Sequence, residues 1–157
     1  MNVSVVTYAL DRLADLGIEH VFGVPGDYAF PINDAVEVHP RLTWVPSANE
    51  LNAAYAADGY TRRRGAGIVC TTYGVGELSA LNGLMGAMAE RLPVFHLVGV
   101  PSLRIIRQGL ICHHTLGDRN YNRFEAISSA ASYVNARLTP SQDQSTRQCG
   151  GGTRGCT

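Results

Sequence analysis

Residues 67–83 read GIVCTTYGVGELSALNG, a short apolar run that passes through two closely spaced glycines into a segment rich in small side chains. The run at residues 67–72 is continuously apolar, which suits a parallel strand covered on both faces. Gly74 and Gly76 predict a tight turn, and residues 77–90 are expected to form a helix. A buried strand that turns directly into a helix is typical of parallel α/β sheets.

The segments on both sides continue this alternation. Further strands are expected at residues 20–24, 42–46, 93–100 and 131–134. Further helices are expected at residues 3–16, 28–36 and 49–63. We therefore predict an α/β fold in which a parallel sheet of about five strands carries helices on both faces. Ligands bind outside the carboxyl ends of such strands, which draws attention to the loops at residues 25–28, 46–50, 72–77 and 99–115.

Length and composition exclude several classes of protein. The 157 residues suffice for one domain, and 13 Lys plus Arg balance 13 Asp plus Glu, so nothing indicates a nucleic acid or an anionic membrane as partner. No apolar run approaches the roughly 20 residues that span a bilayer, and Asp11, Arg12 and Asp15 lie where a secretory signal needs an apolar core. The four cysteines lack metal-ligand spacing, and Cys70 lies inside an apolar run. We therefore expect a reducing, cytoplasmic environment.

The composition changes after Pro140. Residues 141–157, SQDQSTRQCGGGTRGCT, contain no aliphatic, aromatic or methionine side chain. Such a segment cannot bury enough surface to offset its ordering entropy. We therefore expect a domain at residues 1–140 and a disordered tail at residues 141–157. The tail resembles translation out of frame more than an evolved linker, and resequencing the coding DNA would test this.

Polar side chains occupy the loops that should follow strands. Glu50 begins an alanine-rich helix, where an acid by itself only favours the helix dipole. Asp27 follows a Pro-Gly pair, where aspartate is an ordinary turn residue. His113 and His114 are adjacent, and in a strand they would point to opposite faces and chelate a metal poorly. Taken singly, each residue is explained by local structure alone.

Four segments together match the motifs of one enzyme family. They are GVPGDY at residues 23–28, SANELNAAYAADGY at 47–60, TTYGVGELSALNG at 71–83 and HHTLG at 113–117. The second resembles the signature of the pyrimidine-binding domain of thiamine-diphosphate enzymes, and the third resembles the cofactor loop and helix of pyruvate and indolepyruvate decarboxylases. The fourth resembles the paired-histidine motif that separates these decarboxylases from the synthases. From about residue 3 to about residue 140, the chain resembles the N-terminal pyrimidine-binding domain of a 2-oxo acid decarboxylase, with its C-terminal part incomplete.

The resemblance implies roles for particular residues. Glu50 would hydrogen-bond the far nitrogen of the cofactor's pyrimidine ring and drive the shift to the imino form that generates the ylide. Asp27, His113 and His114 would handle the proton steps at the substrate, for which histidine is suited by a pKa near neutrality. The cofactor-binding residues that it implies are Glu50, Pro25, Gly26, Thr72, Gly74 and Val75.

The resemblance also implies parts that this sequence lacks. In the family, a second domain with Gly-Asp-Gly and, about 25–30 residues later, Asn-Asn holds the diphosphate and its Mg²⁺; neither this pattern nor a Walker-type loop occurs here. We therefore expect no metal ligands in this chain and contact with thiamine diphosphate at the pyrimidine end only. The other half of the site would come from homologous full-length subunits or from a diphosphate-binding chain.

Three interpretations follow from the resemblance. The chain is a truncated or frameshifted decarboxylase that is inactive alone, a stand-alone subunit that pairs with a diphosphate-binding chain, or a non-catalytic module that joins intact homologues. The substrate is open among pyruvate, indolepyruvate, benzoylformate and phenylpyruvate. After Asp118, the stretch Arg119-Asn120-Tyr121 stands where these decarboxylases usually have a Gly-Asp-Phe-like sequence. Because a polar tail replaces the domain's final helix and edge strand, exposed apolar surface should make the chain marginally folded and prone to association.

Overall fold

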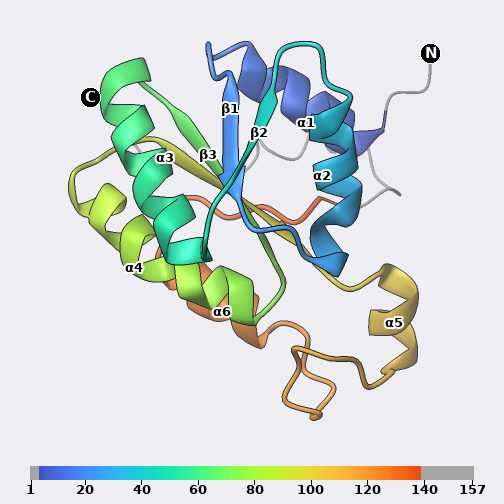
Figure 1. Ribbon diagram of the computed structural model, residues 1–157. Helices are drawn as coiled ribbons and strands as arrows, with labels where there is room; N and C mark the ends of the chain where they lie inside the picture. Colours follow the sequence, from blue (N-terminus) through green and yellow to red (C-terminus); the bar gives the residue numbers. More distant parts are fainter. Residues whose placement is uncertain (1–3, 139–157) are drawn as a thin grey trace, which may run out of the picture.

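A computed structural model describes residues 4–138, and a parallel sheet of four strands lies at its centre (Figure 1). The strands are β1 (His20–Gly23), β2 (Thr43–Pro46), β3 (Gly67–Thr72) and β4 (Val94–Gly99). They lie in the order β2-β1-β3-β4, and β1 pairs with β3 in a register that sets Val21 beside Ile68. The first four predicted strands are therefore confirmed, with small differences at their ends.

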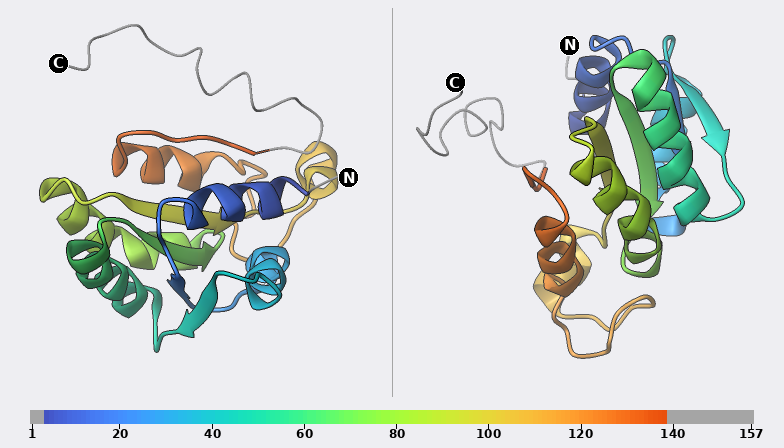
Figure 2. Two further views of the ribbon diagram at one scale, coloured as in Figure 1. Left: turned by 90° about the horizontal axis from the view of Figure 1, so that it is seen from above. Right: turned by 90° about the vertical axis from the view of Figure 1, so that its left-hand side faces the viewer.

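Four helices cover the sheet, two on each face. They are α1 (Val5–Ala14) and α2 (Phe30–Glu37) on one face, and α3 (Glu50–Arg64) and α4 (Val75–Ala89) on the other (Figures 1 and 2). A 3-10 turn, η1 (Asp27–Ala29), precedes α2, and two short helices, α5 (Leu103–Gln108) and α6 (Arg123–Ala130), follow β4. None of the helices that residues 4–138 form has the length and apolar character required to cross a membrane.

The central strand β3 is buried along its whole length. Ile68 and Cys70 belong to the core beneath α1 and α2, while Val69 belongs to the core beneath α3 and α4. Because alternate side chains enter opposite cores, both faces of β3 require apolar residues. Each fully buried Val or Ile side chain contributes roughly 1.5–3 kcal/mol to folding. Burial also raises the pKa of the Cys70 thiol to about 12, so this thiol stays protonated.

Small residues let α3 and α4 approach each other closely. Ala53, Ala54 and Ala57 of α3 are fully buried. A Cβ built on Gly83 of α4 would lie only 2.7 Å from the Cβ of Ala54, so a side chain at this position would push the helices apart. The alanine-rich pattern therefore serves close packing of α3 against α4.

The residues after β4 differ most from the prediction. The strand predicted at residues 131–134 is wrong, since these residues form no strand and Tyr133 and Val134 are 73% and 84% exposed. A short apolar run gains little as a strand unless a neighbouring strand satisfies its backbone groups. Helix α5 lies inside the loop expected at residues 99–115, and α6 has no counterpart in the prediction. The predicted tail at residues 141–157 and the domain boundary at residue 140 lie outside the described residues.

The strand order brings particular loops together. From β1 the chain goes to β2 on one side, and from β3 it goes to β4 on the other side, so the order reverses between β1 and β3. In open parallel sheets, ligands bind at the carboxyl edge beside such a reversal. The loops that leave β1 and β3 at this edge carry Asp27 and Gly74.

Candidate functional site

At this carboxyl edge, the backbones of Gly26 and Gly76 lie against side chains from the ends of β3 and α3. A Cβ built on Gly26, after β1, would lie 2.5 Å from the Cβ of Thr72 at the end of β3. A Cβ built on Gly76, in the first turn of α4, would lie 3.0 Å from Cγ2 of Thr72 and 3.2 Å from Oε1 of Glu50. Only glycine permits such approach of the backbone. We call Gly26, Glu50, Thr72 and Gly76 the cradle; it unites three residues that the sequence predicted separately.

Glu50 is the first residue of α3, but it does not cap that helix. The Asn49 side chain accepts a hydrogen bond of 2.9 Å from the N–H of Asn52, and this contact caps the helix. The Glu50 carboxylate therefore remains free to turn toward Gly76. A negative charge here also favours the helix dipole, but that local effect does not explain the position of the side chain inside the cradle.

Thr72 presents a buried hydroxyl to the cradle. The residue is 6% exposed, and its Oγ1 has no hydrogen-bond partner among the described residues. Leaving a buried hydroxyl unpaired typically costs about 1–3 kcal/mol, so native proteins nearly always supply a partner. A ligand bound against Gly26 and Gly76 would meet this hydroxyl, which supports the predicted role of Thr72 as a hydrogen-bonding residue.

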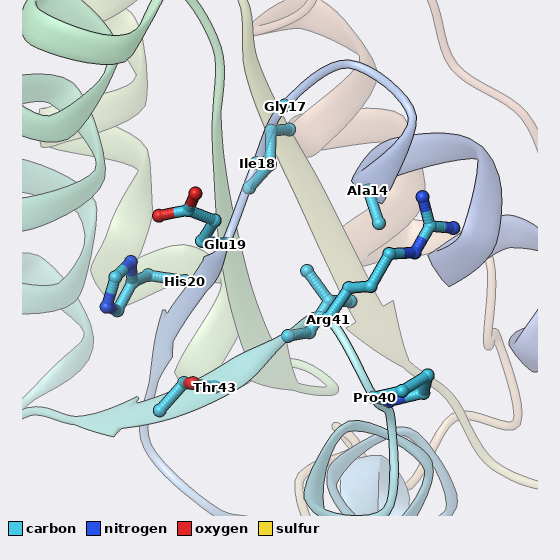
Figure 3. A pocket seen from close by; sticks show the side chains of 9 residues that line it. Ala14, Gly17, Ile18, Glu19, His20, Pro40, Arg41 and Thr43 are labelled. Atoms are coloured by element: carbon cyan, nitrogen blue, oxygen red, sulfur yellow. The ribbon is translucent and has the colours of Figure 1, made fainter.

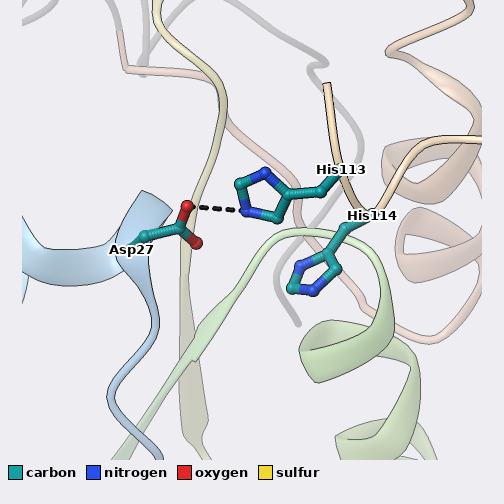
Figure 4. Close-up of side chains that lie close together, drawn as sticks. All are labelled: Asp27, His113 and His114. Carbon is teal, nitrogen blue, oxygen red and sulfur yellow. Dashed lines mark ion pairs between the residues drawn. The ribbon is translucent and has the colours of Figure 1, made fainter. Parts of the chain in front are cut away.

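Asp27 and His113 are far apart in the sequence but form an ion pair in the folded chain (Figure 4). Nε2 of His113 lies 2.6 Å from Oδ2 of Asp27. Partial desolvation raises the pKa of Asp27, but the hydrogen bond and charge of His113 outweigh it, and the net pKa is below the usual range. The Tyr28 ring stacks on the His113 ring at 4.7 Å between centroids, and the Tyr28 hydroxyl donates to the His113 carbonyl oxygen at 3.1 Å. The imidazole is thus held on two sides.

His114 lies beside His113 in a tight loop and not in a strand. Its φ is 59°, a left-handed conformation that few residues other than glycine adopt, and the two imidazole centroids are 4.7 Å apart. The expectation that adjacent histidines point to opposite faces therefore does not apply here. Gly74, with a φ of 70°, supports this loop, because a Cβ there would lie 2.7 Å from the His114 carbonyl oxygen. Nδ1 of His114 is buried and has no partner among the described residues.

Aromatic residues to which the sequence assigned no role hold the histidine loop in place. Tyr73 is 2% exposed and packs edge to face on Tyr28 at 5.9 Å and on Phe124 at 5.1 Å. Its hydroxyl donates to the carbonyl oxygen of Tyr121 at 3.2 Å. Such edge-to-face pairs contribute about 0.5–1.5 kcal/mol each beyond their burial. The sequence feature that could have indicated this role is the recurrence of aromatic residues in or near each motif.

The stretch Arg119-Asn120-Tyr121, which departs from the family pattern, folds with a strained backbone at its first residue. Arg119, where the pattern has glycine, has a φ of 60°. This backbone conformation favours glycine, so the arginine is held in it by the surrounding loop. Tyr121 is buried, and its hydroxyl donates to the carbonyl oxygen of Leu110. The substituted loop is therefore folded and anchored between α5 and α6.

Two predicted cofactor residues lie at the rim of the cradle. Val75, the first residue of α4, is 54% exposed, and Pro25 is exposed in the loop after β1. Val75 stands between Gly74 and Gly76, so the apolar side chain is presented at the open side of the turn. An exposed apolar residue between two close-packed glycines is suited to contact a flat ligand ring.

Glu77 is a buried acid that sequence reasoning did not single out. It is 3% exposed in the first turn of α4, directly behind the cradle. Burial raises the pKa of Glu77 to about 7, and the nearby Ser128 hydroxyl offsets this only in part. The folded chain therefore binds a proton at Glu77 at a pH where the unfolded chain has released it.

This shift makes stability depend on pH. Because the folded state binds more protons than the unfolded state between about pH 4.5 and 7, the free energy of unfolding should fall as the pH rises through this window. We expect Glu77→Gln to gain roughly 2–3 kcal/mol relative to the parent chain on going from pH 5 to pH 8, measured by urea unfolding. Glu37→Gln, at an exposed acid of α2, is the control. An equal difference between Glu77→Gln and parent at both pH values would contradict this assignment.

A separate hollow of about 510 Å³ lies at the opposite, amino edge of β1 and β2 (Figure 3). Its charged rim is already neutralised, since Nη1 of Arg41 lies 2.7 Å from Oδ1 of Asp15. The hydrogen bond from Arg41 holds the pKa of Asp15 below its usual value. Because ligands of parallel sheets bind at the carboxyl edge, we place the functional site at the cradle and not in this hollow.

Comparison with known proteins identifies the family of the chain. Residues 3–123 match the family described as "Thiamine pyrophosphate enzyme, N-terminal TPP binding domain". The chain belongs to this family. Membership in the thiamine pyrophosphate enzymes confirms the resemblance that the four motifs indicated, and the match ends close to the start of α6.

Similar proteins within this family include several from mycobacteria named "Alpha-keto-acid decarboxylase". The chain is 50% identical over 133 residues to the one from Mycobacterium avium (strain 104) and 51% identical over 133 residues to the one from Mycobacterium ulcerans (strain Agy99). It is 49% identical over 136 residues to the one from Mycobacterium leprae (strain TN). These alignments cover 85%, 85% and 87% of this chain, but only 24% of each relative. The chain thus spans about a quarter of the length of these relatives.

Proposed function

We propose that this chain supplies the pyrimidine-binding, cofactor-activating half of the active site of a non-oxidative 2-oxo acid decarboxylase. The observation that carries the proposal is the cradle, in which the Glu50 carboxylate lies against Gly76 and the Thr72 side chain, with its unpaired hydroxyl, lies against Gly26 and Gly76. The Asp27–His113 pair and His114 lie beside the turn after β3, because Gly74 of that turn packs against the carbonyl oxygen of His114. The turn after β3 thus connects the cradle to the cluster of Asp27, His113 and His114, which can carry protons.

These residues fit the pyrimidine end of thiamine diphosphate. Gly26 and Gly76 would let the ring approach the backbone, Val75 would contact its face, and Thr72 would gain the hydrogen-bond partner that it lacks. Glu50 would hold a proton at the ring nitrogen, where a carboxyl in a partly dry cleft forms a strong hydrogen bond. When bound, the cofactor supplies the electron sink for the bond that breaks as carbon dioxide leaves.

The reaction also needs a proton at carbon. A 2-oxo acid anion plus one proton gives an aldehyde plus carbon dioxide, so the site must deliver a proton after the carboxylate departs. Nε2 of His113 and Oδ2 of Asp27 lie 2.6 Å apart, within hydrogen-bond distance, and His114 lies next to this pair. A positioned imidazole is suited to such transfer near neutral pH. We assign proton delivery to these three residues.

The remaining half of the site would lie on another chain or domain. The diphosphate and Mg²⁺ would be held there, since the 157-residue sequence has no Gly-Asp-Gly…Asn-Asn pattern. A homologous full-length subunit or a separate diphosphate-binding chain would fit, as would a non-catalytic association with intact homologues.

Among the described residues, Cys70 and Cys112 are free thiols, which supports a reducing cytoplasm.

The purified 157-residue chain is expected to be inactive by itself. With thiamine diphosphate, Mg²⁺ and pyruvate, indolepyruvate, phenylpyruvate or benzoylformate, it should form no aldehyde above a protein-free control, because nothing in its sequence matches the diphosphate site. Aldehyde is measured by coupled reduction with a dehydrogenase. Steady, enzyme-dependent aldehyde formation by the chain alone would overturn the half-site assignment.

A further inference from the structure

We propose that Asp27, His113 and His114 form a binding site for a divalent first-row cation of the Zn²⁺ type. One ligand atom from each residue lies within 4.8 Å of the other two, and the three come from two loops that are far apart in sequence (Figure 4). Two imidazoles and one carboxylate are the donors that zinc prefers after thiolate. The site is separate from the Mg²⁺ site that the resemblance assigns to a second domain, and it departs from the expectation that this chain holds no metal ligands.

The geometry requires only small movements. Zinc binds imidazole nitrogen and carboxylate oxygen at about 2.0–2.2 Å in a tetrahedral arrangement, which places neighbouring ligand atoms about 3.3 Å apart. Nε2 of His113 and Oδ2 of Asp27 lie 2.6 Å apart, so the ion would enter by replacing the direct contact between these two atoms and separating them slightly. The side chains of His113 and Asp27 are 55% and 45% exposed, so both can rotate into place and the ion can reach them.

The surroundings already orient the ligands. Tyr28 stacks on His113 and binds its carbonyl oxygen, and Gly74 supports the backbone of His114. Nδ1 of His114 is buried without a partner among the described residues, so this ring has an unused hydrogen-bonding position. Oriented ligands with firm outer contacts are what distinguish a metal site from a chance cluster. Three protein ligands leave a fourth position open for water or a carboxylate.

Metal binding and proton delivery would exclude each other. The cation would bind the lone pairs of the imidazole nitrogens and replace the direct contact between Asp27 and His113, so these groups could no longer carry a proton to the substrate. This consequence rests on the proposed function, whereas binding of the ion does not. The test is therefore made without cofactor or substrate. If the chain does not bind Zn²⁺, the proposed catalytic function is unaffected, and if the catalytic function is wrong, Zn²⁺ binding can still be judged.

The experiment is a Zn²⁺ titration of the 157-residue chain, followed by NMR of its labelled histidine side chains. The chain has five histidines. We expect the signals of His113 and His114, assigned from His113→Gln and His114→Gln, to shift with Zn²⁺, while those of the other three do not. Each of these variants should weaken binding by roughly tenfold or more, and His20→Gln, which removes a histidine outside the cluster, should leave the affinity of the cluster unchanged.

Asp27→Asn is the decisive variant. In the folded chain it removes one of the three ligands, and roughly tenfold weaker binding is expected. In an unfolded chain Asp27 would lie far from the histidines, so its loss would change nothing. Equal Zn²⁺ affinity of Asp27→Asn and parent, or Zn²⁺ binding that leaves the His113 and His114 signals unmoved, would overturn the proposal.

Discussion

Glu50→Gln is expected to lower the rate of decarboxylation by a completed enzyme by roughly 10²–10⁴-fold, the range typical of losing a proton-transferring side chain. The completed enzyme is a chimera in which residues 1–138 replace the matching N-terminal region of the Mycobacterium avium relative, to which the chain is 50% identical. Glutamine keeps the size of the side chain beside Gly76, but it cannot lend a proton to a ring nitrogen. The kcat and the KM for thiamine diphosphate are measured separately for each 2-oxo acid.

The matched control for this variant is Glu37→Gln, at an exposed acid of α2 away from the carboxyl edge. It should leave kcat within about twofold, as surface substitutions usually do. If Glu50→Gln raised only the KM for the cofactor and left kcat intact, Glu50 would be a binding residue alone. That result would contradict its assigned role as the proton-holding acid.

Gly74→Ala is expected to destabilise the 157-residue chain by about 2–4 kcal/mol and to displace the histidine loop. The reason is twofold. Gly74 has a φ of 70°, and the added Cβ would lie 2.7 Å from the His114 carbonyl oxygen and 3.2 Å from the Phe124 ring. Neither neighbour is free to withdraw, because Phe124 packs on Tyr73. Urea unfolding measures the free energy, and the His113 and His114 NMR signals report the position of the loop.

Gly117→Ala separates backbone strain from the steric clash. Gly117 also has a positive φ, of 73°, but nothing lies within 4 Å of the position of its Cβ. Gly117→Ala should therefore lower the free energy of unfolding only by the cost of the backbone strain, about 1 kcal/mol. If the two variants lost equal stability, the contact between Gly74 and the histidine loop would not be what holds that loop.

The sequence predicted most accurately the parts of the fold that repeat a simple pattern. β3 is continuously apolar and buried, and the 15-residue helices α3 and α4 begin at a capping asparagine and at a glycine, so local and tertiary preferences agree there. Residues 131–134 have a strand-like composition, but no neighbouring strand pairs with them, and that depends on the rest of the chain. Helix α5 was missed although its signals were present: Ser102 caps its start, and Gly109 ends it with a φ of 61°.

The candidate site shows the same division. Glu50, Thr72 and the glycines could be placed at one edge from the predicted parallel strands and the motifs alone, because each lies at or after the end of a strand. The approach of Gly76 to Glu50, the stacking of Tyr28 on His113 and the burial of Glu77 could not be predicted, since each depends on packing between distant segments. The clustering of three potential metal ligands was also hidden, because it requires the left-handed conformation of His114.

The most direct test of the central claim is the activity of the parental chimera. If residues 1–138 form the pyrimidine half of the site, the chimera should release carbon dioxide and aldehyde from a 2-oxo acid, with a rate that saturates with thiamine diphosphate. A chimera that folds and assembles like the Mycobacterium avium relative, yet forms no aldehyde from any 2-oxo acid that the relative decarboxylates, would contradict the claim.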